Sequence, residues 1–157
     1  MLKPLNVWSM SDEEIGRKMS NFAHTPFLLD GVEFASVEAF YVWLLLSTTA
    51  TERKLEKVRL KWGLQAKRLG PHAKPPAVVY RGVTMPPGGP DHIALIRRAL
   101  RAKLDAHVEI AREFVATAPR PIAHETGHPD RPGAEFPRET FCRLLSELRD
   151  ELAREHG

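Results

Sequence analysis

Cysteine is almost missing from this sequence, which has a single one, Cys142, in 157 residues. One cysteine cannot form an internal disulfide, so a small scaffold held together by disulfides is excluded, and a reducing compartment such as the cytoplasm is favoured. Cys142 falls on the apolar face of the helix expected near the end of the chain. A buried, unreactive thiol is therefore favoured there over a nucleophile.

Long apolar runs are also missing. No stretch approaches the roughly 20 apolar residues that a membrane-spanning helix needs. The first residues lack a basic segment followed by an apolar one, so we expect no secretory signal. We therefore expect a cytoplasmic protein without a membrane partner.

The sequence also lacks a large excess of one charge. It has 23 basic and 20 acidic residues, which give a net charge of +3. Basic residues gather only at residues 53–67 and 97–103. The ordinary interpretation of each group is a solvated helix face, and the alternative is a site for a phosphate-bearing ligand. The balance does not favour binding to a nucleic acid duplex through a broad patch.

The hydrophobic content, 43% of residues, is enough for one domain with a real core, spanning residues 1–157. Apolar spacing predicts a mainly α fold with a small β element, of the α+β class. The expected elements are a strand within residues 5–10, a helix at 11–18, a hairpin at 27–34, helices at 37–47, 51–59 and 62–70, a helix at 91–117 that is the longest and is capped by Asp91, and a last helix after Pro137. Proline and glycine predict long loops at about 70–90 and 119–136, with a short extended piece at 78–80.

The hairpin and the helix after it carry the first candidate for chemistry. Asp30-Gly31 tolerates the positive φ of a two-residue turn, and Ser36 is a good N-cap residue. Glu38 then lies in the first turn of an otherwise apolar helix. It either serves that helix through the favourable macrodipole or acts as a catalytic carboxylate near a cleft.

Lys103 is the second candidate, because it lies at the edge of the apolar stripe of the 91–117 helix. Its amine either extends out to solvent along its alkyl stem or is held in a pocket, for a phosphate or for covalent chemistry. His107, one turn later, is interpreted as a core histidine.

The segment His124-Glu125-Thr126-Gly127-His128 matches the two-histidine zinc motif of metalloproteases. That site requires a helix, which Gly127 and the adjacent Pro129 disfavour. No third ligand stands out beyond Asp130. We therefore expect no metal and no organic cofactor, and a zinc hydrolase is the weakest of the functional hypotheses.

Several blocks in one order resemble the NADAR superfamily, the YbiA-like N-glycosidases. The matching blocks are Ser20-Asn21-Phe22, Pro26-Phe27, Leu29-Asp30-Gly31, Phe34, Ser36-Val37-Glu38-Ala39-Phe40-Tyr41, Ala66-Lys67-Arg68-Leu69-Gly70, Arg97-Arg98-Ala99-Leu100-Arg101-Ala102-Lys103-Leu104, Ala116-Thr117-Ala118-Pro119 and Leu144-Leu145-Ser146-Glu147-Leu148-Arg149. The resemblance covers most of the chain from Ser20.

The resemblance implies a single compact, mainly helical domain that cleaves an N-glycosidic bond to a ribose. Family substrates include phosphoribosyl-pyrimidine intermediates of riboflavin synthesis and ADP-ribose attached to guanine bases. The expected partner is thus a small ribosyl phosphate or ADP-ribosyl compound, or an ADP-ribosylated base of a nucleic acid. Glu38 falls on the family's acidic active-site position, and Lys103 falls on the family's recurring helix lysine, so the resemblance implies that both are catalytic residues. The residues expected to bind substrate are Asn21, Phe22, Tyr41, Arg97, Arg101 and Glu125.

The sequence also departs from the family pattern. Trp43-Leu44-Leu45-Leu46 replaces a lysine after the glutamate, and Gly88-Gly89-Pro90 replaces a tryptophan. Glu125 could stand in for the family's late acid with a shift of one residue, and Tyr80 could supply an aromatic ring. These departures leave a second hypothesis open: a catalytically decayed module that binds a nucleotide or ADP-ribose as a sensor or specificity factor.

Overall fold

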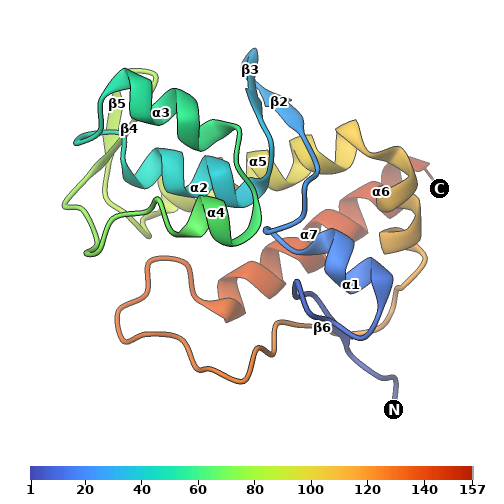
Figure 1. Ribbon diagram of the computed structural model, residues 1–157. Helices are drawn as coiled ribbons and strands as arrows, with labels where there is room; N and C mark the ends of the chain where they lie inside the picture. Colours follow the sequence, from blue (N-terminus) through green and yellow to red (C-terminus); the bar gives the residue numbers. More distant parts are fainter. Residues whose placement is uncertain (157) are drawn as a thin grey trace.

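A computed structural model describes residues 1–156 of the chain (Figure 1). The helices are α1 (Glu14–Met19), α2 (Val37–Leu45), α3 (Glu52–Arg59), α4 (Gly63–Lys67), α5 (Pro90–Ala106), α6 (Val108–Val115) and α7 (Arg138–His156). The strands are β1 (Leu5–Asn6), β2 (Phe27–Leu29), β3 (Val32–Phe34), β4 (Val78–Tyr80), β5 (Val83–Met85) and β6 (Ile122–Ala123). The predicted class, mainly α with a small β element, is confirmed.

Helix α2 is the centre of the fold. It contacts α3, α4, α5, β3 and β4, and most of its residues are buried. Figure 1 shows α3 above α2 and α4 below it, with α5 passing behind. A helix that is apolar around most of its circumference has to be covered on all sides, which explains why so many short elements gather around it.

The predicted helix starts at Ser36 and Thr51 are confirmed. The Ser36 hydroxyl oxygen accepts a hydrogen bond from the Ala39 amide at 3.0 Å, and Thr51 accepts one from the Lys54 amide at 3.2 Å. Each side chain satisfies a backbone donor that the first helical turn leaves free.

Two hairpins use the same kind of turn. Asp30 and Gly31 have φ values of 48° and 82° between β2 and β3, and Arg81 and Gly82 have 49° and 82° between β4 and β5. The first hairpin is confirmed. In the second, the extended piece at 78–80 is confirmed, but its partner β5 was not predicted, because Val83 to Met85 is a very short run inside a loop rich in proline and glycine.

Asp30 also ties the hairpins to α5. Its carboxylate accepts hydrogen bonds from the Tyr80 hydroxyl at 2.5 Å and from Arg98 at 2.8 Å. The hydrogen bond from Arg98, followed by that from Tyr80, lowers the pKa of Asp30 to about 2. Tyr80, proposed above as a ring for a ligand, therefore serves as a link between the two turns.

The long helix predicted at 91–117 is wrong in its continuity and in its start. It is interrupted at His107, where φ is −128° and ψ is 74°, and the His107 Nε2 lies 2.8 Å from the Pro26 carbonyl oxygen. This long-range hydrogen bond accompanies the break between α5 and α6. The N-cap of α5 is Gly89, and Pro90 fits the first helical position because its missing N–H is not needed there. Asp91 is therefore inside the helix, and α7 is the longest helix.

Strand β1, near the start of the chain, forms a parallel pair with β6, with Leu5 opposite Ile122 and Asn6 opposite Ala123. Strand β6 lies inside the loop predicted at 119–136, and only Leu5–Asn6 of the strand expected within residues 5–10 is regular. The sequence nearby could not predict the bounds of β1 or the existence of β6, because strands of two residues form only through pairing with a distant segment. Within residues 1–156, no helix is both long and apolar enough to cross a membrane.

Phe40 tests the central role of α2. It is fully buried, and its ring packs edge-on against Phe34 with a centroid separation of 5.0 Å. We expect Phe40→Ala to lower the free energy of unfolding by about 3–5 kcal/mol, through lost transfer energy and the cavity left behind. Urea denaturation measures this loss. The control is Leu28→Ala in β2, which is 66% exposed and should change the free energy by less than about 1 kcal/mol; equal losses in the two variants would contradict the assignment of the core.

Candidate active site

Glu38 lies where α2 begins. Its backbone amide donates a hydrogen bond to the Asn21 carbonyl oxygen at 3.0 Å, and the residue is half-buried. Burial raises the pKa of the Glu38 carboxyl to about 7, although the positive charge of Lys67 in α4 opposes the shift. A carboxyl group that titrates near neutral pH can exchange protons with a ligand, which is a common property of active-site acids.

Lys103 reaches the same region from α5. The residue is only 1% exposed, and its amine donates a hydrogen bond to the Ser20 carbonyl oxygen at 3.0 Å. Burial lowers the pKa of Lys103 to about 7. The interpretation of an amine that extends to solvent is therefore wrong, because the apolar stripe encloses the whole side chain.

The loop at Ser20 and Asn21 is where these two elements meet. The Ser20 carbonyl oxygen accepts a hydrogen bond from the Lys103 amine, and the Asn21 carbonyl oxygen accepts one from the Glu38 backbone amide. The Asn21 side-chain oxygen is buried and has no hydrogen-bond partner within residues 1–156. A buried acceptor without a donor is costly in a folded protein, so this oxygen is a candidate to accept a hydrogen bond from a ligand or water.

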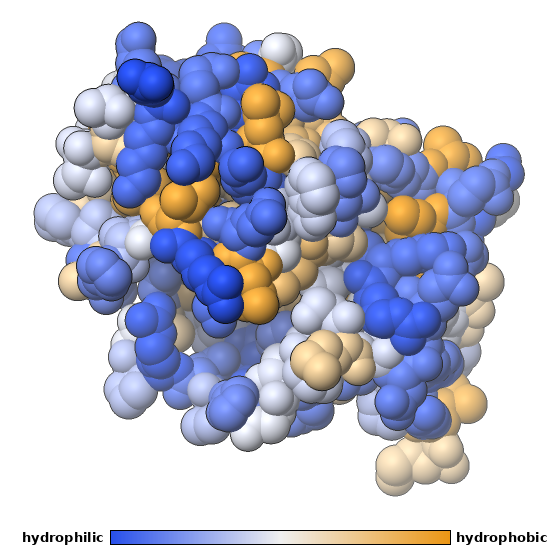
Figure 2. All heavy atoms as spheres, in the orientation of Figure 1, coloured by the Kyte–Doolittle hydropathy of each residue, from blue (hydrophilic) through white to orange (hydrophobic). Residues whose placement is uncertain are grey.

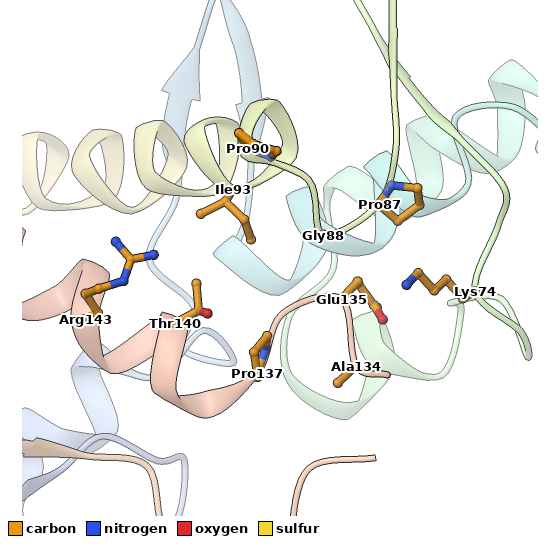
Figure 3. A pocket seen from close by; sticks show the side chains of 10 residues that line it. All are labelled: Lys74, Pro87, Gly88, Pro90, Ile93, Ala134, Glu135, Pro137, Thr140 and Arg143. Atoms are coloured by element: carbon orange, nitrogen blue, oxygen red, sulfur yellow. The ribbon is translucent and has the colours of Figure 1, made fainter. Parts of the chain in front are cut away.

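A cavity of about 550 Å³ opens nearby, a size typical of small-molecule sites. It lies between the loop before α5 and the loop before α7. Figure 3 shows Lys74 and Arg143 on opposite sides of this space, with Glu135 between them. The lining residues are Lys74, Pro87, Gly88, Pro90, Ile93, Ala134, Glu135, Pro137, Thr140 and Arg143.

Tyr41 connects Glu38 to this cavity. It lies three residues after Glu38 in α2, so the two side chains share one face of the helix. The Tyr41 hydroxyl donates a hydrogen bond to Glu135, which is 8% exposed and lines the cavity. Burial, followed by the bond to Glu135 and the charges of Glu135 and Glu38, raises the pKa of Tyr41. Glu38, Tyr41 and Glu135 thus form a polar array that leads from the start of α2 to the cavity.

His92 completes the buried polar group. Its ring stacks on that of Tyr41 with a centroid separation of 6.1 Å, and its Nδ1 accepts a hydrogen bond from the Gly88 amide at 2.8 Å. Burial lowers the pKa of His92, while the charge of Glu135 opposes the shift. The imidazole is therefore neutral with its proton on Nε2, which has no partner within residues 1–156.

The predicted site residues thus divide into two groups. The structure brings Glu38, Asn21 and Tyr41 together, and Lys103 contacts the adjacent Ser20. Phe22 is in the same loop, half-buried, and its carbonyl oxygen accepts a hydrogen bond from the Gly63 amide at 3.1 Å. The roles of these residues in catalysis or binding remain predictions.

Arg97 and Arg101 are in the other group. Arg101 lies 2.8 Å from Glu151 and 2.6 Å from Glu155, and Arg97 lies 3.5 Å from Glu151. Residues two apart in a helix point in nearly opposite directions, so Arg101 faces α7 while Lys103 faces Ser20. The structure uses both guanidinium groups to hold α5 against α7 and does not bring them to Glu38. The acidic partners in α7 could not be assigned from sequence alone.

Glu125 is not brought to the cavity either. It is exposed and lies 3.3 Å from Arg138. The acid of this loop that reaches the cavity is Glu135, which sequence reasoning missed along with His92. The sequence carries only a weak indication for Glu135, which is that this acid directly precedes Phe136 and Pro137 at the start of the last helix.

The zinc motif is not assembled. Its segment is not helical, as predicted, and Gly127 has a φ of 84°. The His124 Nδ1 instead lies 2.6 Å from the Val7 carbonyl oxygen. Throughout residues 1–156, no three or more His, Cys, Asp or Glu side chains are grouped in a way that could hold a metal ion.

The burial of Lys103 predicts a specific pH dependence of stability. Because its pKa is about 7 in the folded chain and 10.5 as the reference, the unfolded chain binds more protons between these values, and stability rises with pH. We expect a gain of about 2 kcal/mol from pH 7 to 9, measured by urea denaturation. Lys103→Met should abolish this gain, whereas exposed Lys54→Met should keep it. Parallel curves for the wild type and Lys103→Met would contradict the burial of a charged amine.

Comparison with known proteins supports the architecture. No family model and no curated protein matches the chain. Among solved structures, the NMR structure of the E. coli protein YbiA is similar, with a TM-score of 0.68 and 24% sequence identity, covering 99% of this chain and 89% of that one. At this identity the match speaks for the fold and not for the chemistry. The chain therefore has the YbiA-like fold that its resemblance to the NADAR superfamily implied.

Proposed function

We propose that this protein is an N-glycosidase that hydrolyses the bond between C1′ of a ribose and a base nitrogen, in a phosphorylated ribosyl or ADP-ribosyl compound. The observation that carries the proposal is the polar array from Glu38 through Tyr41 to Glu135, which ends in a cavity with a cation on each side. The YbiA-like fold and the sequence resemblance support the same reaction class.

The chemistry follows from charge. When the bond from C1′ to nitrogen breaks, its electron pair leaves with the base and positive charge develops on the sugar. A carboxylate held close to C1′ stabilises this charge, as in other glycosidases. Glu38 takes that role in its ionised form, which is half-populated near pH 7. A water molecule then attacks C1′, the carboxylate accepts its proton, and that proton passes to the departing nitrogen, so that the products are the free base and the phosphorylated ribose or ADP-ribose.

The remaining groups orient the substrate. The unpartnered oxygen of Asn21 accepts a hydrogen bond from a sugar hydroxyl, and the bond from Tyr41 holds Glu135 in place. Lys74 has no carboxylate within ion-pair distance in the described part of the chain, and its amine donates a long hydrogen bond to the Gly133 carbonyl oxygen at 3.5 Å. Its amine is thus free to bind a phosphate of the substrate.

A second candidate function is binding without turnover, as a sensor or specificity factor. The observation that favours it is the enclosure of Lys103, whose amine is committed to Ser20 and does not line the cavity. In this case ADP-ribose binds with measurable heat, and no base is released during long incubation.

Glu38→Gln tests the first function. We expect it to reduce release of free base by at least about 100-fold, because the amide cannot carry the negative charge. In the wild type, kcat/KM should rise with pH through about 7 as Glu38 loses its proton. Mass spectrometry of the base released from a panel of ribosyl nucleotides gives the rates. Glu33→Gln, at an exposed position in β3, is the control, and unchanged turnover in Glu38→Gln would remove the mechanism.

Lys74→Glu tests the phosphate site. We expect KM for a phosphorylated substrate to rise at least tenfold, because a carboxylate repels the phosphate, while kcat changes much less. The same kinetic assay measures both constants. Arg154→Glu, an equal change of charge at an exposed position in α7, should leave KM within about twofold. A KM that changes equally in the two variants would place the phosphate elsewhere.

A further inference from the structure

The positive charge of the chain is concentrated in one short segment. Residues 52–68, which hold α3 and α4, contain seven basic and two acidic residues, for a local net charge of +5. The rest of the chain has sixteen basic and eighteen acidic residues, a net charge of −2. The basic character of the protein thus comes from these two helices and the linker between them.

Most of these cations have no partner. Arg59 forms an ion pair with Glu56 at 2.7 Å. Throughout residues 1–156, the other six have no carboxylate within ion-pair distance. They are Arg53, Lys54, Lys57, Lys61, Lys67 and Arg68. By contrast, Arg97, Arg101 and Arg120 elsewhere are paired with acids.

An exposed aromatic pair lies in the same segment. The Trp62 ring stacks on His24 with a centroid separation of 3.9 Å and an interplanar angle of 11°. Trp62 is 42% exposed, and the adjacent Leu60 and Leu64 are also exposed. His24 covers one face of the Trp62 ring, and tryptophan rings that remain partly exposed are enriched at binding interfaces.

The helices present these groups outward. Val58 of α3 and Ala66 of α4 are buried and both helices contact α2, whereas the side chains of Arg53, Lys54, Lys57, Lys67 and Arg68 are exposed. Figure 2 shows that the surface over α3 is largely hydrophilic. The linker between the helices is fixed to the candidate site, because the Ser36 hydroxyl donates to the Lys61 carbonyl oxygen at 2.9 Å. The charge of Lys67 acts on Glu38 itself.

We propose that this α3–α4 surface, defined by Trp62, His24 and the six unpaired cations, binds single-stranded nucleic acid. Cations that follow a phosphate backbone, together with an exposed ring on which a base can stack, are the two features that single strands require. In a duplex the faces of the bases are stacked on one another and cannot stack on Trp62. An acidic peptide could pair with the cations but has no base to stack on the ring. The proposal goes beyond the glycosidase function, because strand binding needs no reaction at Glu38.

Fluorescence anisotropy of a labelled 20-nucleotide oligo(dT) strand tests the proposal with the full chain. We expect binding that weakens about 50-fold between 50 and 200 mM salt if four phosphates are contacted. Trp62→Ala should weaken binding about 5- to 100-fold without changing the salt slope. Lys57→Gln with Lys61→Gln should lower the slope by about 1.4. The matched control, Arg112→Gln with Arg154→Gln on α6 and α7, should leave both affinity and slope unchanged.

The proposal would be overturned by no binding at low salt, by equal losses in the matched control, by equally tight binding of a duplex, or by full binding of the strand by Trp62→Ala. Competition by polyglutamate as strong as that by unlabelled strand would do the same and would point to an acidic protein partner. Circular dichroism melts confirm that each variant is folded. Base release from a free nucleotide, measured in parallel, should persist in the variant with both Lys57 and Lys61 changed, so that failure of strand binding is distinguishable from failure of the glycosidase proposal.

Discussion

The burial of α2 is the constraint on which the rest of the structure depends. This helix is apolar around most of its surface and carries one charged residue, Glu38, in its first turn. Three other helices and two hairpins are packed against it, so that its apolar faces are removed from water. Its polar start is then held by the Ser36 cap and by the loop at Ser20 and Asn21. The same packing that stabilises the core therefore fixes where the candidate active site can be.

Packing also sets the protonation of that site. Removing a carboxylate or an ammonium group from water disfavours its charged form, so the pKa of Glu38 rises and that of Lys103 falls, both to about 7. Within residues 1–156 neither group forms an ion pair, and the charge of Lys67 only partly opposes the shift of Glu38. At neutral pH the chain thus retains two buried ionisable groups, and their burial lowers the free energy of unfolding. Such a cost is expected where a reaction needs protons exchanged near pH 7.

The exterior of the molecule uses its charges in two distinct ways. Along α5 and α7, arginine and glutamate side chains pair across the helices, which leaves little net field. Along α3 and α4, cations remain unpaired beside an exposed indole ring, and this surface adjoins the start of α2. The division explains how a chain with a net charge of only +3 presents a strongly basic surface.

Local rules predicted the elements that depend on neighbouring residues. The Asp30-Gly31 turn, the caps at Ser36 and Thr51 and the apolar α2 follow from backbone preferences and spacing within a few residues. The candidate site was predictable to the extent that Glu38 and Lys103 stand out as single ionisable groups at the edge of apolar stripes. Glu135 and His92 were missed, because their importance comes from the side chains of Tyr41 and the backbone of Gly88, which are distant or uninformative in sequence.

The sequence by itself determined the α+β class, the positions of most helices and the first hairpin, because these depend on interactions within one or two turns of chain. Only the tertiary structure decided that the long helix breaks at His107, that β1 pairs with β6, and that Arg101 faces α7 while Lys103 faces the loop at Ser20. These outcomes arise from contacts between residues far apart in the chain. Whether a charged side chain is paired, free or enclosed is settled by that packing and not by the residue type.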